Sequence, residues 1–138
     1  SLARENIKKY DIFIDIDKNG KLYVVEDITY DFENNKRHGI FRFIPYLRGE
    51  PKNINVIMDN IDIPETKIRK NKTDVYIRIG SPNRYVTGIH KYRISYTMDR
   101  IVTKFDENLN TIRFNAIGTE WKIPIFNITI KIGLDSIF

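Results

Sequence analysis

Apolar residues recur at every second position through most of the chain, with polar residues between them. The first clear segment places Tyr10, Ile12, Ile14 and Ile16 on one side and charged residues on most positions of the other. This alternation is typical of a β-strand with one buried face. A turn at Asp17–Gly20 follows, and the alternation resumes from Leu22 to Phe32. The two segments therefore predict a β-hairpin.

Further strand-like segments follow along the chain, separated by loops rich in polar residues, Gly and Pro. They span residues 40–44, 54–58, 75–79, 89–102, 111–117 and 125–132. The basic run Lys67–Lys72 is expected between strands, and the segment near the C-terminus is expected to turn Phe126, Ile128, Ile130 and Ile132 inward. Seven to nine short strands, each with one apolar face, predict an antiparallel β-sandwich in a single domain of residues 1–138. A closed barrel is the main alternative.

Composition strengthens the all-β prediction. The 138 residues contain 25 isoleucines and only 2 alanines, and β-branched side chains fit strands better than helices. There is no cysteine, which excludes disulfides and thiolate chemistry.

Candidate catalytic residues are sparse. The two histidines, His38 and His90, lie far apart in the sequence and match no metal-binding spacing, and no serine lies in a nucleophile motif. We therefore predict no catalytic residues, no metal and no cofactor, and hence a protein that is not an enzyme. A hydrolase with a loop site near His38, His90 and nearby acidic residues is a third alternative, which requires those side chains to converge.

Two charged residues interrupt apolar patterns. Glu26 falls in register with Val24 and Ile28, and Arg42 is flanked by Phe41 and Phe43. A buried carboxylate without a partner is costly. We therefore predict that Glu26 and Arg42 form a structural ion pair or share one polar network.

Charge and aromatic content leave several binding functions to weigh. The formal net charge is +5, but most aromatic residues fall on the apolar faces, which argues against a nucleic-acid partner. Attraction to an anionic membrane surface fits the charge better. A glycan-binding or small-ligand module is the alternative function, with Tyr23, Tyr76, Tyr85 and Trp121 as the candidate aromatic contacts.

The order of several short motifs resembles the N-terminal domain of the YciQ-like predicted membrane proteins, a bacterial family of unknown function. The resemblance covers almost the whole chain, and its most specific motif is His38-Gly39-Ile40-Phe41-Arg42-x-Ile44-Pro45. The other motifs are the Asn19-Gly20 hairpin, Val24-x-Glu26-x-Ile28, Thr87-Gly88-x-His90-x-Tyr92 and Gly118-x-x-Trp121-x-Ile123-Pro124. The chain departs from the family at Phe114, where a tryptophan is expected.

This resemblance implies a larger parent protein, with transmembrane helices outside the present chain and this domain on the extracytoplasmic side. No apolar run in the chain itself approaches the roughly 20 residues that span a bilayer. The resemblance supplies family-motif positions of unknown role at His38, Gly39, His90, Gly118 and Trp121. We therefore expect a non-enzymatic recognition or scaffolding domain of a bacterial membrane protein, whose partner is an envelope protein or the membrane segments of its own parent.

Overall fold

The computed structural model describes residues 4–46, 49–99, 102–104, 110–112 and 123–134. Within these ranges it contains ten strands and no helix. The strands are β1 (Asn6–Ile16), β2 (Leu22–Asp31), β3 (Gly39–Pro45), β4 (Lys52–Met58), β5 (Thr66–Lys70), β6 (Asp74–Gly80), β7 (Ile89–Met98), β8 (Val102–Lys104), β9 (Asn110–Ile112) and β10 (Ile128–Leu134).

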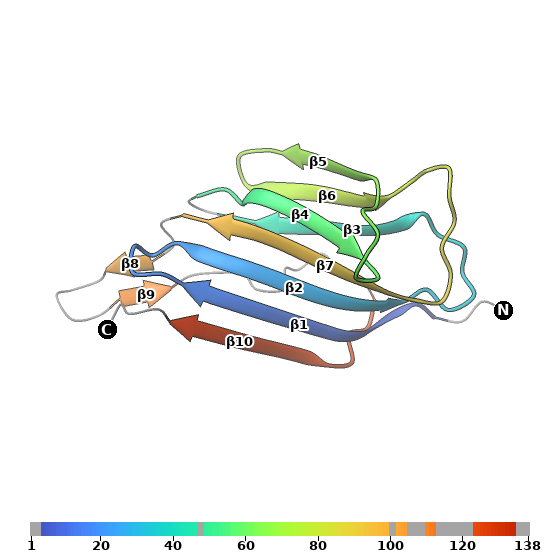
Figure 1. The fold of residues 1–138 in the computed structure, drawn as a ribbon, viewed down its shortest axis with the longest axis horizontal. Coiled ribbons are helices and arrows are strands. Elements are labelled where there is room, and N and C mark those ends of the chain that lie inside the picture. The colour runs from blue at the N-terminus through green and yellow to red at the C-terminus, as the bar shows by residue number, and fades with distance from the viewer. Residues whose placement is uncertain (1–3, 47–48, 100–101, 105–109, 113–122, 135–138) are drawn as a thin grey trace.

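Five strands form the larger sheet, in the order β10-β1-β2-β7-β4 (Figure 1). The predicted hairpin joins β1 to β2 with Ile14 opposite Val24. Its turn is held by Asp17, whose Oδ1 accepts hydrogen bonds from the backbone N–H groups of Asn19 and Lys21. Gly20 follows with a φ of 82°, in the left-handed region that glycine adopts without strain.

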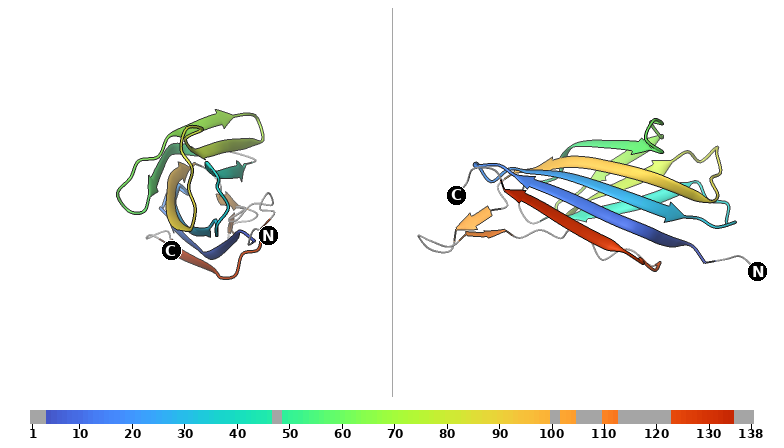
Figure 2. Two further views of the ribbon diagram at one scale, coloured as in Figure 1. Left: turned by 90° about the vertical axis from the view of Figure 1, so that its right-hand side faces the viewer. Right: turned by 60° about the horizontal axis from the view of Figure 1, so that its bottom comes forward.

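The smaller sheet has the order β3-β6-β5, and β8 pairs separately with β9. Figure 2 shows the larger and smaller sheets curving around a common interior when the molecule is viewed along its strands. Ile40 and Ile44 of β3 and Ile77 of β6 point into this interior, where they join buried residues of the larger sheet such as Ile12 and Tyr92. The predicted all-β sandwich is confirmed.

Three details differ from the sequence-based expectation. β10 pairs with β1 in parallel, whereas all other strand pairs in the described residues are antiparallel. The basic run from Lys67 was wrongly placed between strands, because Thr66–Lys70 pairs with β6 as strand β5. Phe126, Ile128, Ile130 and Ile132 are exposed instead of buried. The three isoleucines lie on β10, the edge of the larger sheet, which has a neighbouring strand on one side only, and Phe126 precedes that strand.

Candidate functional site

A buried polar network lies between the two sheets. Arg42 of β3 donates from Nε to Glu26 Oε1 at 2.8 Å and from Nη2 to Glu26 Oε2 at 3.0 Å. Two tyrosine hydroxyls also donate hydrogen bonds to the Glu26 carboxylate, Tyr10 to Oε1 and Tyr96 to Oε2, each at 2.5 Å. The remaining guanidinium nitrogen, Nη1, donates to the carbonyl oxygen of Phe43. The structure thus brings together the two charged residues that the sequence pairs.

The charged residues of this network are buried, and burial and the contacts within the network shift the pKa values of Arg42 and Tyr96. Glu26 is 0% exposed and Arg42 is 1% exposed. Burial lowers the pKa of Arg42, but the Glu26 carboxylate and the neighbouring Tyr10 hydroxyl outweigh burial and hold that pKa above its usual value. Burial, reinforced by Glu26, raises the pKa of Tyr96. The network connects β1, β2 and β7 with β3 across the core.

His90 lies in a second polar cluster, at the start of β7. Its Nδ1 is 2.7 Å from Asp59 Oδ2 and its Nε2 is 2.9 Å from the carbonyl oxygen of Thr87. The other Asp59 oxygen accepts the backbone N–H of Lys91 at 2.9 Å. Burial raises the pKa of Asp59, but the hydrogen bonds from His90 and Lys91 outweigh it and lower that pKa below its usual value. His90 and Asp59 thereby fix the turn that follows β4.

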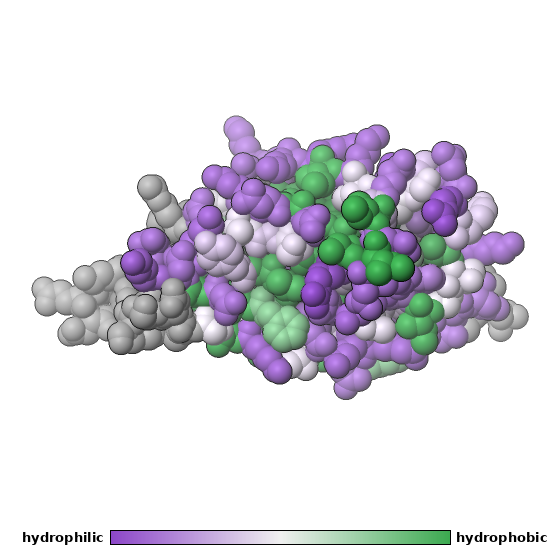
Figure 3. Space-filling view, in the orientation of Figure 1, coloured by the Kyte–Doolittle hydropathy of each residue, from purple (hydrophilic) through white to green (hydrophobic). Residues whose placement is uncertain are grey.

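That turn carries two exposed isoleucines. Ile61 and Ile63 are 83% and 86% exposed, the highest values among the large hydrophobic side chains described. The backbone beneath them is ordered by two hydrogen bonds between Met58 and Asp62, of 2.8 and 2.9 Å. Figure 3 shows hydrophobic surface where the segment between β4 and β5 runs in Figure 1. We call residues 59–65 the β4–β5 loop.

The family-motif residues His38 and Gly39 lie at the start of β3. The backbone of Gly39 faces that of Gly80 in β6, and a Cβ at Gly39 would lie 1.8 Å from the carbonyl oxygen of Ile79. Glycine is therefore required for the two strands to approach. The His38 ring stacks on Tyr85 with centroids 4.6 Å apart, and its Nδ1 is 2.8 Å from the carbonyl oxygen of Arg84.

The outer face of the smaller sheet combines three aromatic and three cationic side chains. Strand register places them in two rows across the sheet, one of Phe41, Arg78 and Lys67 and the other of Phe43, Tyr76 and Arg69. The Tyr76 ring lies 5.5 Å from that of Phe41 and 4.8 Å from that of Phe43, between centroids. We call these six residues the cationic–aromatic face.

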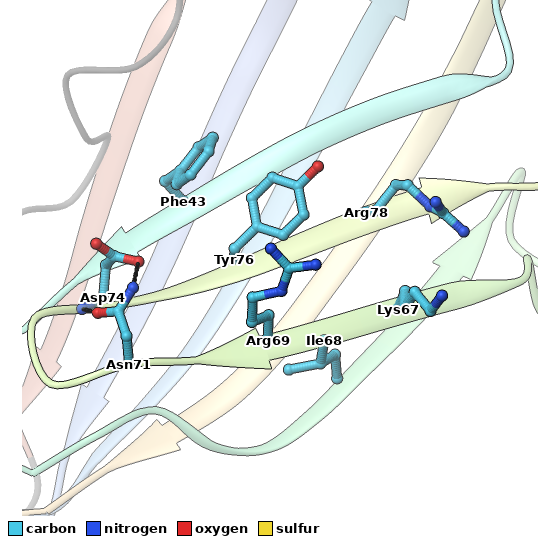
Figure 4. A pocket seen from close by; sticks show the side chains of 8 residues that line it. All are labelled: Phe43, Lys67, Ile68, Arg69, Asn71, Asp74, Tyr76 and Arg78. Atoms are coloured by element: carbon cyan, nitrogen blue, oxygen red, sulfur yellow. Dashed lines mark hydrogen bonds between the residues drawn. The ribbon is translucent and has the colours of Figure 1, made fainter.

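Two hollows open on this side of the molecule. One, of about 530 Å³, lies over five of the six residues and reaches Asn71 and Asp74 at the hairpin that joins β5 to β6 (Figure 4). The other, of about 410 Å³, is lined by Phe41, Arg78, His38 and Lys36 among others. Arg78 borders both hollows.

The remaining predicted residues do not assemble into one site. His38 and His90 have separate partners in the structure, and among the described residues there is no group of three or more metal-ligating side chains. Tyr23 and Tyr85 are exposed, but Tyr23 lies on the larger sheet and Tyr85 against His38. Gly118 and Trp121 lie outside the described residues.

Sequence reasoning missed Asp59 and the cationic–aromatic face. A usable signal for the face was present, because Lys67 and Arg69 flank Ile68 with the period of two expected for a strand. No comparable signal links Asp59 to His90, since 31 residues separate them.

Comparisons with solved structures return likeness to small parts of much larger enzymes. A variant M1 zinc metallopeptidase from Deinococcus radiodurans, bound to a Tyr-Ser-Ala substrate, aligns with 86% of this chain at 11% identity and a TM-score of 0.45. Leukotriene A4 hydrolase from Saccharomyces cerevisiae aligns with 68% of this chain at 9% identity and a TM-score of 0.46. The chain spans 26% and 15% of those two proteins. No curated protein sequence matches it significantly.

A family model gives a more extensive match. The model for the N-terminal domain of a predicted membrane protein, DUF2207, matches residues 6–136, nearly the whole chain. No helix in the described part of the chain is long and apolar enough to cross a membrane. The matched region includes all ten strands, the buried network and the cationic–aromatic face. The chain belongs to the DUF2207 family of predicted membrane proteins, of whose N-terminal domain it is an example.

Proposed function

We propose that this chain is a non-catalytic recognition or scaffolding domain that faces the extracytoplasmic side of a bacterial membrane protein, as in the YciQ-like proteins that it resembles. Its partner is another envelope protein or the membrane-embedded part of its own parent. The observation that carries the proposal is the β4–β5 loop, which presents Ile61 and Ile63 to solvent on a backbone that other residues hold in place.

Exposed apolar side chains on a fixed backbone suit protein recognition. Association costs conformational entropy, and this cost is smaller when the binding loop is already ordered. The β4–β5 loop is ordered by the pair of Met58–Asp62 backbone bonds and by the contact between Asp59 and His90. Under this proposal His90, a family-motif position, is a positioning residue for the loop.

The burial of the Glu26–Arg42 network supports a structural role for that pair. Both carboxylate oxygens are occupied by Arg42 and by the hydroxyls of Tyr10 and Tyr96, and the side chains lie in the core. A group enclosed in this way braces the two sheets, whereas a catalytic acid or base has to meet its substrate.

Photo-crosslinking in the full-length membrane protein tests the recognition role. A photoreactive amino acid at Ile61 or Ile63 should give discrete protein adducts in native membranes, and one at Lys9, on the outer face of the larger sheet, serves as the matched control. Adducts should diminish in the His90→Ala background, because the loop loses its anchor. Equal adduct patterns from Ile61, Ile63 and Lys9, or none from any of them, would contradict the proposal.

Residues 1–138 contain no cysteine, so a cysteine introduced into this domain can test its sidedness. A single cysteine introduced at exposed Tyr85 should react with a membrane-impermeant maleimide in intact cells, and the parent without this cysteine is the control. Labelling only after the cells are broken would place the domain on the cytoplasmic side.

A further inference from the structure

We propose that the cationic–aromatic face is a docking surface for an anionic phospholipid bilayer, with Lys67, Arg69 and Arg78 contacting lipid phosphates and Phe41 inserting among the headgroups. The face is distinct from the β4–β5 loop, and the proposal does not depend on which side of the membrane the domain occupies.

The cations of this face have no acidic partner among the described residues. None of Lys67, Arg69 and Arg78 forms a salt bridge with a described residue. Nε of Arg78 is buried, and among the residues that the structure describes it has no hydrogen-bond partner. Asp74 is the acid that borders the hollow, and its two oxygens already accept hydrogen bonds from Asn71 and Thr73. Lys67 and Arg69 are exposed and can therefore meet an anionic partner at the surface, and Arg78 lies beside Lys67 in the strand register.

The outer face of the larger sheet provides the contrast. Two of its cations have acidic partners on the same face, with Lys9 Nζ 3.5 Å from Asp11 Oδ2 and Arg93 bonded to Asp27 through two contacts of 2.8 Å. Charges of both signs lie on that face, whereas the six residues of the cationic–aromatic face include three cations and no acid. The net charge of +5 is therefore unevenly placed.

The aromatic side chains give the same face an apolar part. Phe41 is 53% exposed, and its ring continues into the rings of Tyr76 and Phe43. Figure 4 shows Phe43, Tyr76 and Arg69 beside one another on the sheet. Aromatic and basic side chains that share one face are typical of surfaces that bind at the membrane interface, where rings enter the headgroup region and cations stay near phosphates.

We favour a bilayer over other anionic partners because the chain belongs to a family of predicted membrane proteins. A domain tethered to a membrane meets lipid headgroups at a high effective concentration, so weak contacts suffice. Each basic residue close to an anionic surface contributes about fivefold in affinity. The three cations together should then raise the affinity for the bilayer about a hundredfold, and this gain should fall with increasing salt.

Vesicle sedimentation tests the proposal with the 138-residue chain. The chain should bind vesicles that contain phosphatidylglycerol, and it should not bind vesicles of phosphatidylcholine alone. The triple variant Lys67→Gln, Arg69→Gln, Arg78→Gln should bind about a hundredfold more weakly. The control triple variant Lys9→Gln, Lys91→Gln, Lys131→Gln removes the same net charge from the larger sheet and should stay within about threefold of the unaltered chain.

Equal losses in the two triple variants would overturn the proposal, because binding would then follow net charge alone. Binding to soluble dextran sulfate without any binding to vesicles would also overturn it, in favour of an anionic polysaccharide.

A fluorescence measurement keeps the cations intact. Phe41→Trp should show a blue-shifted emission when phosphatidylglycerol vesicles are added, relative to the unaltered chain with its single tryptophan. Tyr23→Trp, at an exposed position of the larger sheet, should show no such shift. No shift at Phe41→Trp, or equal shifts at both positions, would contradict insertion of this face.

Discussion

Glu26 and Arg42 show how much one pair of residues constrains the interior. Each charge is buried, and each has its principal partner in the other. Removing both charges from water is costly, and the mutual attraction offsets this cost only because the geometry is bidentate and the two tyrosines satisfy the remaining lone pairs. The pair links the two sheets across the core, because Glu26 lies on β2 of the larger sheet and Arg42 on β3 of the smaller sheet.

A double-mutant cycle measures this coupling. Glu26→Gln and Arg42→Met should each lower the free energy of unfolding by about 3–5 kcal/mol, because each leaves one buried charge without its partner. The double variant should cost clearly less than the sum of the two. Urea unfolding provides the measurement, and additive losses would show that the two side chains do not stabilise each other.

Two strands of the smaller sheet approach through glycine. Gly39 and Gly80 face each other, and both have φ angles in the region that favours glycine, of 153° and 133°. A side chain at either position would meet backbone of the opposite strand within 2 Å. The start of β3 therefore depends on the absence of a Cβ, and this strand carries both Arg42 and Phe41.

Gly39→Ala should destabilise the fold by more than about 2 kcal/mol, because the new methyl group displaces the Ile79 carbonyl in addition to straining the backbone. Gly88→Ala is the matched control. Its φ of 74° is also unfavourable for alanine, but a Cβ there meets nothing within 4 Å, so it should cost about 1 kcal/mol. Thermal unfolding of both variants compares them, and similar losses would show that backbone strain alone matters.

The turn after β4 depends on the ionised form of Asp59. Its pKa in the folded chain is lowered by its hydrogen bonds with His90 and Lys91, against the effect of burial. The unfolded chain has the ordinary, higher pKa, so the stabilisation from this carboxylate is present above about pH 4 and is lost as the pH falls through the folded-state value.

An NMR titration can follow the backbone amide of Asp62, which bonds to Met58 in the same turn. On acidification below about pH 4 this amide should lose its ordered environment in the unaltered chain. In Asp59→Asn the amide should show no such transition, because the titrating group is gone. A transition that persists in the variant would assign the effect to another group.

Because tyrosines are buried in the interior, the stability of the fold should decrease at alkaline pH. Burial raises the pKa of Tyr92, and burial with the Glu5 hydrogen bond raises that of Tyr30. Burial also raises the pKa of Tyr96. In the unfolded chain these groups ionise near pH 10, so the stability they contribute is present below that pH and is lost as the pH rises toward the folded-state values.

The free energy of unfolding, measured by circular dichroism, should therefore fall steeply above about pH 10. In Tyr92→Phe the free energy of unfolding should fall less steeply over this range. The variant lacks one hydroxyl that is buried in the folded chain and that ionises once the chain unfolds. Absorbance of tyrosinate should rise together with loss of structure. An unchanged pH dependence in the Tyr92→Phe variant would contradict this assignment.

The period of two in residues such as Ile12, Ile14, Val24 and Ile28 was sufficient to predict strands, a hairpin and a sandwich, because burial of one face is a local property of a strand. The same logic singled out Glu26 and Arg42, since a charge in register with a buried face needs a partner. Alternation alone does not fix which strands become neighbours. The exposed isoleucines of β10 therefore escaped prediction, because an edge strand has the same pattern as a central one.

The sequence by itself determined the all-β class and the anomalous charges in its core, since both follow from which residues alternate along the chain. Tertiary structure alone decided that β10 runs parallel to β1, that His90 meets Asp59, and that Lys67, Arg69 and Arg78 gather beside three aromatic rings. These outcomes depend on pairing between segments distant in sequence, whose register is set by the packing of the whole core.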